Sequence, residues 1–127
     1  MTLPDEVLAL LEQPVFAFVA TSFPSGQPQN TPVWITVVDG RPLFNTAVGR
    51  VKERNLRRDP RLSLSFLTLH DPEEYVELRG TAEFSLDGAD DMIDALSRKY
   101  LGTEFAHHSP SQQRINVFVN VDRVSRG

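Results

Sequence analysis

The sequence predicts a mainly β (α+β) fold in which six antiparallel strands form a small closed or split β-barrel with two to three short helices. Three observations predict it. Apolar residues alternate with polar ones in several short segments, as they do in half-buried strands. Links of hairpin length join most of these segments, which favours antiparallel pairing. The 127 residues fit one domain, residues 1–127, and are too few to cover both faces of a large open sheet.

The strands are predicted where β-branched and aromatic residues are frequent and apolar side chains alternate with polar ones. Pro24-Ser25-Gly26 and Asp39-Gly40 are turn signals that join the first three strands as hairpins. The six predicted strands span residues 15–23, 30–38, 43–46, 62–66, 76–84 and 115–122.

The helices are predicted from apolar spacing and from residues that start or stop helices. Apolar side chains between Met92 and Leu101 recur at helical spacing, and Gly102 then fits a C-terminal cap. The three predicted helices span residues 4–12, residues 50–58 and the segment from Asp87-Gly88 to Leu101, and a polar loop follows at 103–113.

Positive charge is concentrated in one segment of an otherwise acidic chain. The net charge is −4, yet the segment from Arg41 to Arg61 holds seven of the 13 basic residues and two acidic ones, a local charge of +5. A general nucleic-acid binder is usually basic overall. We therefore expect this segment to bind a small anion.

Several classes of chemistry are excluded by what the sequence lacks. The chain has no cysteine, so thiol nucleophiles, disulfides and thiolate metal sites are absent. It has no Gly-rich dinucleotide fingerprint, phosphate-binding loop or nucleophile elbow. His107 and His108 lie in the polar loop, where we expect solvated side chains and no metal site. The sequence singles out no catalytic side chain.

The composition and the N-terminus predict a cytoplasmic protein. With 40% apolar and 24% charged residues, the chain has a globular profile. No apolar run approaches the ~20 residues of a spanning helix. The acidic, amphipathic N-terminus does not resemble a secretory signal.

The positive signal is the segment from Thr46 to Leu56, which passes from a strand end through Gly49 into a helix. Free amides at a helix N-terminus favour an anion, and Gly49 allows a ligand to approach. Arg50 and Lys52 would add charge, provided that Arg50 lies at the non-helical entry of the helix. The alternative is a solvated basic helix whose cations pair with acids, for instance Arg50 with Glu53.

A family resemblance extends over nearly the whole chain. The segments that carry it are Asn30-Thr31-Pro32-Val33-Trp34, Leu43-Phe44-Asn45-Thr46-Ala47, the Arg-x-Lys-x-x-Asn-Leu pattern at residues 50–56, Asp59-Pro60-Arg61-Leu62-Ser63-Leu64, Tyr75-Val76-Glu77-Leu78-Arg79-Gly80-Thr81-Ala82 and Arg98-Lys99-Tyr100-Leu101-Gly102. In this order they resemble the split-barrel flavin and deazaflavin oxidoreductases related to pyridoxamine 5′-phosphate oxidase. The likeness is greatest to the branch that uses the deazaflavin coenzyme F-420.

The resemblance implies a fold of the FMN-binding split-barrel type, a cofactor site and a homodimer. In such proteins one strand follows the ring system of the cofactor, a helix start holds its phosphate and tail, and the partner subunit completes the pocket. The residues that match the ring-binding strand here are Asn30, Pro32, Val33 and Trp34. Those assigned to the phosphate and tail are Thr46, Gly49, Arg50, Lys52 and Asn55. Phe118, with Asn116 and Asn120 beside it, is compatible with burial at the subunit interface.

The implied activity is transfer of a hydride from reduced coenzyme F-420 to a polarised double bond of a small organic substrate, with Tyr75 and Arg79 as candidates to polarise the acceptor. Arg54, Arg57 and Arg58 favour this longer anionic cofactor over FMN, which is the alternative. A non-enzymatic carrier of a flavin, haem or tetrapyrrole is a second alternative. The scarcity of lysine and the overall acidity argue against a nucleic-acid module.

Overall fold

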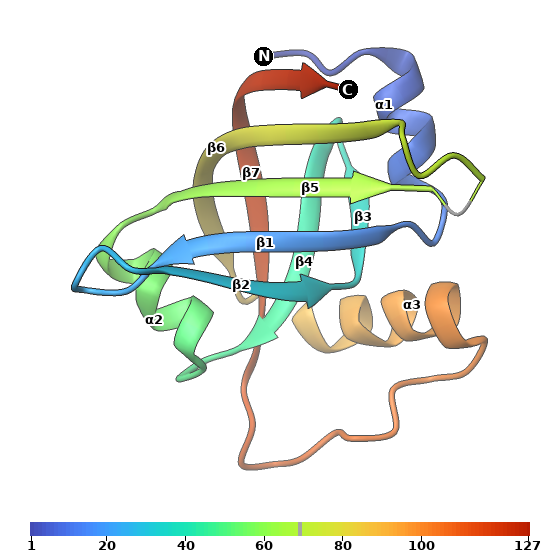
Figure 1. Ribbon diagram of the computed structural model, residues 1–127. Helices are drawn as coiled ribbons and strands as arrows, with labels where there is room; N and C mark the ends of the chain where they lie inside the picture. The colour runs from blue at the N-terminus through green and yellow to red at the C-terminus, as the bar shows by residue number, and fades with distance from the viewer. Residues whose placement is uncertain (69) are drawn as a thin grey trace.

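The structure, a computed structural model, describes residues 1–68 and 70–127, which form seven strands and three helices (Figure 1). The strands are β1 Phe16–Ser22, β2 Pro28–Val33, β3 Ile35–Val38, β4 Arg41–Ala47, β5 Arg61–Leu67, β6 Tyr75–Ser85 and β7 Arg114–Arg126. The helices are α1 Asp5–Leu11, α2 Val51–Arg58 and α3 Ala89–Leu101. The mainly β, α+β prediction is confirmed, and the three helices lie within two residues of their predicted bounds.

The prediction of six strands is wrong, because residues 30–38 form parts of two strands instead of one. β2 pairs with β1, and β3 pairs with β4, so the segment changes partner at Trp34. All pairs are antiparallel, in the order β2-β1-β5-β6-β7-β4-β3. β2 and β3 are therefore the two edges of one sheet, joined by a single residue. The sheet must curl to bring its edges together, and it forms a half-barrel (Figure 1).

The core lies inside this curled sheet. On β5, Leu62, Leu64 and Phe66 are buried while the serines between them face outward, as the alternation predicts. Helix α1 adds the fully buried Val7 and Leu11 to the same core.

A glycine permits the close approach of β6 and β7. The register of the two strands shifts between Arg79 and Gly80. A Cβ atom at Gly80 would collide with the backbone carbonyl of Asn120, so only glycine fits there.

Helix α3 is fixed at its C-terminal end by two consecutive side chains. Lys99 Nζ donates hydrogen bonds to the carbonyl oxygens of Leu11 (2.6 Å) and Ile35 (2.7 Å). The Tyr100 hydroxyl donates to the carbonyl of Val15 at 2.9 Å and accepts from the Ile35 amide at 3.3 Å. These bonds tie α3 to α1 and to the starts of β1 and β3.

Among the described residues, no helix combines the length and apolar character needed to cross a bilayer.

Candidate functional site

A cavity of about 320 Å³ lies between β1, the β2–β3 junction, β4 and the start of α2. Much of its lining is apolar and comes from β1 and from the segment around Trp34. The Tyr100 ring stacks on Trp34, with ring centroids 5.7 Å apart and an interplanar angle of 14°. The polar and charged residues of its lining include Asn45, Thr46, Arg50 and Lys52. The cavity thus combines flat apolar walls with a cationic end.

Six of the nine predicted cofactor residues line this cavity, namely Pro32, Val33, Trp34, Thr46, Arg50 and Lys52. The other three do not. Asn30 is exposed on β2, opposite Ala20 of β1. Asn55 is buried, and its Nδ2 donates to Thr21 Oγ1 at 3.1 Å, so it fastens α2 to β1.

Gly49, which the sequence analysis expects to let a ligand approach, does not line the cavity, and its amide is bonded within the fold. It adopts a left-handed conformation, with φ of +95°, and its N–H donates to Glu53 Oε1 at 2.7 Å. The Arg50 amide bonds to the carbonyl of Ala47 at 3.2 Å. The amides of Gly49 and Arg50 are therefore not available to an anion at this helix start.

Arg50 lies at the extended entry to α2, with φ of −69° and ψ of 158°, as the spacing of Arg50 and Lys52 requires. Glu53 pairs with Arg57 at 2.7 Å instead of with Arg50. Within residues 1–68 and 70–127, neither Arg50 nor Lys52 forms a salt bridge. Burial, together with the positive charges of Arg50 and Arg114, lowers the pKa of Lys52. The site has a surplus of positive charge.

The hydroxyl of Thr46 is an unsatisfied polar group in the cavity wall. Thr46 is 2% exposed, and its Oγ1 has no hydrogen-bond partner in the part of the chain that the structure describes. Buried hydroxyls are usually hydrogen-bonded, so a free one beside two cations suits a ligand with polar oxygen atoms.

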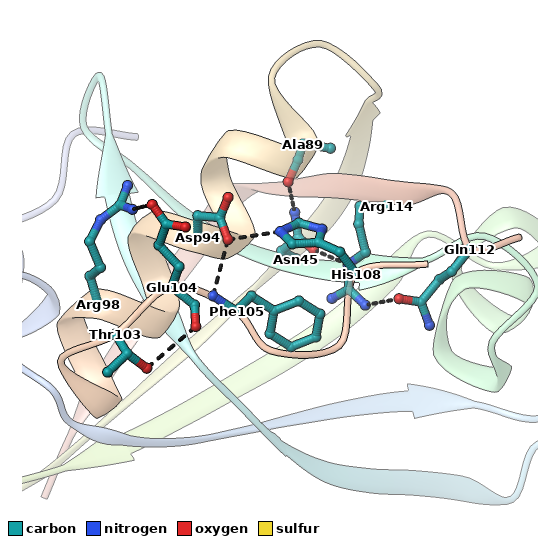
Figure 2. A network of polar contacts seen from close by, with 10 residues as sticks. All are labelled: Asn45, Ala89, Asp94, Arg98, Thr103, Glu104, Phe105, His108, Gln112 and Arg114. Carbon is teal, nitrogen blue, oxygen red and sulfur yellow. Dashed lines mark hydrogen bonds and ion pairs between the residues drawn. The ribbon is translucent and has the colours of Figure 1, made fainter. Parts of the chain in front are cut away.

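Arg114 is a third cation at this site, and the sequence analysis missed it. The residue is 7% exposed. Its Nε donates to Asn45 Oδ1 at 2.8 Å, and its Nη1 donates to Gln112 Oε1 at 3.1 Å (Figure 2). Burial, with the charge of Arg50 as a second cause, lowers the pKa of Arg114. Only the pairing of β4 with β7, which sets Arg114 opposite Ala47, reveals its position.

The C-terminal part of the basic segment is neutralised within the fold. Arg57 Nε contacts Glu53 Oε2 at 2.7 Å, and its guanidinium lies 4.0 Å from the centroid of the Phe84 ring. Arg58 donates to the carbonyl of Ser22. Arg61 contacts Asp59 at 2.7 Å, and its hydrogen bonds lower the pKa of Asp59 to about 2. These arginines do not join Arg50 and Lys52 in one groove.

The predicted substrate residues lie outside the cavity. Tyr75 and Arg79 are exposed on the outer face of β6, and Arg79 contacts Glu77 at 3.0 Å. Both line a separate hollow of about 610 Å³, which shares Phe18 with the first cavity.

The loop after α3 is held on the helix by Asp94. Its Oδ1 accepts from the Phe105 amide at 3.0 Å and lies 2.8 Å from His108 Nε2 (Figure 2). The Phe105 ring meets Trp34 edge-on, with centroids 6.5 Å apart. His108 is therefore exposed but also bonded, which differs from the solvated histidine that the sequence analysis expects.

Comparison of the sequence with known families and proteins gives two matches. The family model described as pyridoxamine 5′-phosphate oxidase matches residues 3–124. The pyridoxine/pyridoxamine 5′-phosphate oxidase of Bacteroides thetaiotaomicron is 32% identical over 115 residues, which are 89% of this chain. They are 53% of that protein, so the chain spans about half the length of this relative.

Solved structures share the fold over nearly the whole chain. An F420 reductase has 25% sequence identity and a TM-score of 0.83, over 97% of this chain and 98% of that one. A conserved hypothetical protein of Mycobacterium tuberculosis has 24% identity and a TM-score of 0.79, over 99% and 84% of the two chains.

Proposed function

The chain belongs to the pyridoxamine 5′-phosphate oxidase family of split-barrel oxidoreductases, and from that premise we propose that it is a coenzyme F-420-dependent reductase. Its reaction is the transfer of a hydride to a polarised double bond of a small organic substrate. The likeness to an F420 reductase supports this cofactor. The observation that carries the proposal is the cavity, in which apolar walls meet Arg50 and Lys52, two cations that form no salt bridge with the described residues.

The cavity suits a flat ring that bears a phosphate tail. Trp34, Val33 and Pro32 form an apolar surface of the kind that packs against a ring system. Arg50 and Lys52 suit a phosphate, which Arg binds as a fork and Lys as a point charge. The free hydroxyl of Thr46 offers a further hydrogen bond. The residues present therefore fit a deazaflavin or a flavin.

A bound deazaflavin would supply the hydride. The residues of the chain would bind and orient the deazaflavin. The apolar walls would exclude water from the ring and would help to hold the substrate against it. Tyr75 and Arg79 remain proposed substrate residues. Since they lie on the outer face of β6, they can meet the substrate only across a subunit contact.

We propose a homodimer in which a second copy covers the outer face of β1, β5 and β6 and completes the cavity. Three large aromatic side chains are exposed on this face: Phe16 by 52%, Phe18 by 40% and Tyr75 by 48%. Phe16 and Phe18 also line the cavity, so a second copy that packs on these two rings would close the cavity as well. Phe118 also stays a candidate for the interface, and its ring centroid lies 4.2 Å from the guanidinium carbon of Arg41.

Light scattering after gel filtration tests the dimer. Leu67→Glu adds a charge to the outer face of β5 without touching the cavity, and we expect it to yield monomers that bind the cofactor weakly. Leu101→Glu is the matched control, since Leu101 is 65% exposed at the far end of α3. A monomeric wild-type protein would contradict this part of the proposal.

Calorimetric titration with coenzyme F-420 and with FMN tests the cofactor. We expect micromolar binding of coenzyme F-420 and weaker binding of FMN. Tighter binding of FMN would favour the alternative, an FMN-binding split-barrel oxidoreductase. Failure to bind either would overturn both. Binding without turnover on any enone would favour a non-enzymatic carrier, and titration with haem or another tetrapyrrole would then identify its ligand.

A further inference from the structure

We propose that Arg114 is a third binding residue for the phosphate of the cofactor, and that the anion lies between Arg114, Arg50 and Lys52. The inference rests on the proposed function, because the same cavity must take a phosphorylated ligand. It assigns a binding role to a residue at the start of β7, far from the basic segment in the sequence.

Arg114 lies beside the start of α2, because it pairs with Ala47, whose carbonyl accepts from the Arg50 amide at 3.2 Å. Its Nε donates to Asn45 Oδ1 (Figure 2), and Asn45 is one of the residues that line the cavity. Arg114 itself lines a separate polar hollow of about 660 Å³ next to α3. The Nη2 group has no hydrogen bond among the described residues. Arg114 can therefore donate to a ligand without giving up its present bonds.

Arg41 shows what Arg114 lacks. Each guanidinium lies over a phenylalanine ring, that of Arg41 at 4.2 Å from the Phe118 centroid and that of Arg114 at 5.2 Å from the Phe105 centroid. Each also donates to an asparagine Oδ1. Arg41 has a carboxylate as well, that of Glu83 at 3.0 Å. Arg114 has only amide oxygens, and in the described ranges no carboxylate lies within salt-bridge distance of it.

Positive charge that is buried without a counter-ion is unfavourable. Three cations share this corner, since Arg50 acts on both Lys52 and Arg114, and Arg114 acts on Lys52. Among the described residues, the one carboxylate that acts on Arg114 is that of Asp90, and it does so without a direct contact. A bound phosphate would relieve the repulsion among all three cations. The described residues thus leave these cations without the counter-ion that such a group would supply.

The test compares Arg114→Gln with Arg41→Gln, a matched control whose carboxylate partner marks it as structural. Calorimetry measures the binding of coenzyme F-420, FMN and riboflavin, which lacks the phosphate. For Arg114→Gln we expect about 10- to 100-fold weaker binding of the phosphorylated ligand that the wild type prefers, and less than about twofold change for riboflavin. For Arg41→Gln we expect no change beyond about twofold. Equal affinity of wild type and Arg114→Gln for the phosphorylated ligand would overturn the inference.

A second measurement separates this inference from the proposed function. Inorganic phosphate should raise the melting temperature of the wild type and of Arg41→Gln, but that of Arg114→Gln clearly less. If the wild type binds neither cofactor, the proposed function fails. If phosphate also stabilises the wild type and Arg114→Gln equally, the role of Arg114 is overturned as well. Should Arg114→Gln not fold, Arg114→Lys replaces it. Lysine keeps the charge but not the fork, so we expect weaker binding of the phosphorylated ligand, and an unchanged affinity would overturn the inference.

Discussion

The two ends of the basic segment contain the same kinds of residue in opposite electrostatic states. At the start of α2, Arg50 and Lys52 border a cavity, and no salt bridge within the described residues neutralises them. At the end of α2 and just beyond it, Arg57 and Arg61 are each paired with a carboxylate. One part of the segment can therefore attract an anion, while the other contributes to the fold.

The difference shows that local charge identifies a segment but not a site. The charge of +5 between Arg41 and Arg61 counts all its cations alike. The structure divides them by their partners, and it adds Arg114 from another strand. What marks the site is positive charge that forms no salt bridge with the described residues.

The largest effect is expected where the comparison is tested directly, by removing one cation from each end. Lys52→Ala should weaken binding of the phosphorylated cofactor by about 1.5–3 kcal/mol, roughly 10- to 150-fold, through loss of a charged hydrogen bond. Arg61→Gln should bind the phosphorylated cofactor with wild-type affinity, because Asp59 already neutralises Arg61 in the wild type. Calorimetry measures both. A Lys52→Ala protein with wild-type affinity would make the two ends of the segment equivalent.

A smaller effect is expected at Glu53, the acid that separates the two ends. Its buried carboxylate accepts from Gly49 and from Arg57, both at 2.7 Å. Glu53→Gln should lower the free energy of unfolding by about 1–2 kcal/mol, because two charged hydrogen bonds become weaker. The same change removes a negative charge near Lys52, so phosphate binding should not weaken.

Urea denaturation measures the predicted loss of stability, and phosphate titration measures whether binding is retained. Glu104→Gln is the matched control, since Glu104 forms an exposed pair with Arg98 and should change neither quantity by a measurable amount. Loss of phosphate binding in Glu53→Gln would mean that the acid shapes the site.

The last effect concerns the stability contributed by the second half-buried lysine. Burial, opposed by the charge of Glu12, lowers the pKa of Lys99 to about 8 from an ordinary value of 10.5. The folded state then binds fewer protons than the unfolded chain between these values, so stability should rise with pH from about 8 to about 10.5. Lys99→Met should lack this rise.

Urea denaturation across this pH range, with and without phosphate, sharpens the comparison of the two lysines. Phosphate should leave the contribution of Lys99 unchanged, because its partners are backbone carbonyl oxygens and no cation of the site acts on its pKa. An identical pH slope in wild type and Lys99→Met would show that another group causes it.

The fold follows from local patterns except where one segment has two pairing partners. Alternation along residues 62–66 and helical spacing from Met92 to Leu101 report burial directly, and both predictions agree with the structure. The segment 30–38 looks like one strand because both of its halves favour extended backbone. Its division at Trp34 depends on β1 and β4, which local sequence does not describe.

The candidate site is predictable to the extent that one segment builds it. Arg50 and Lys52 come from a contiguous motif, and both line the cavity. Asn55 belongs to the same motif but is turned toward Thr21, and nothing in its spacing indicates that orientation. Arg114 meets Asn45 across 69 residues of sequence, so only the strand pairing brings them together.

The position of Trp34 also has a photophysical consequence. It is the only tryptophan in the chain, and it forms part of the cavity wall against the ring of Tyr100. A flat chromophore that enters the cavity lies next to the sole indole and, where its absorption overlaps indole emission, accepts the excitation energy. The indole emission of the protein therefore reports occupancy of this one cavity, without a label and without a second tryptophan elsewhere in the chain.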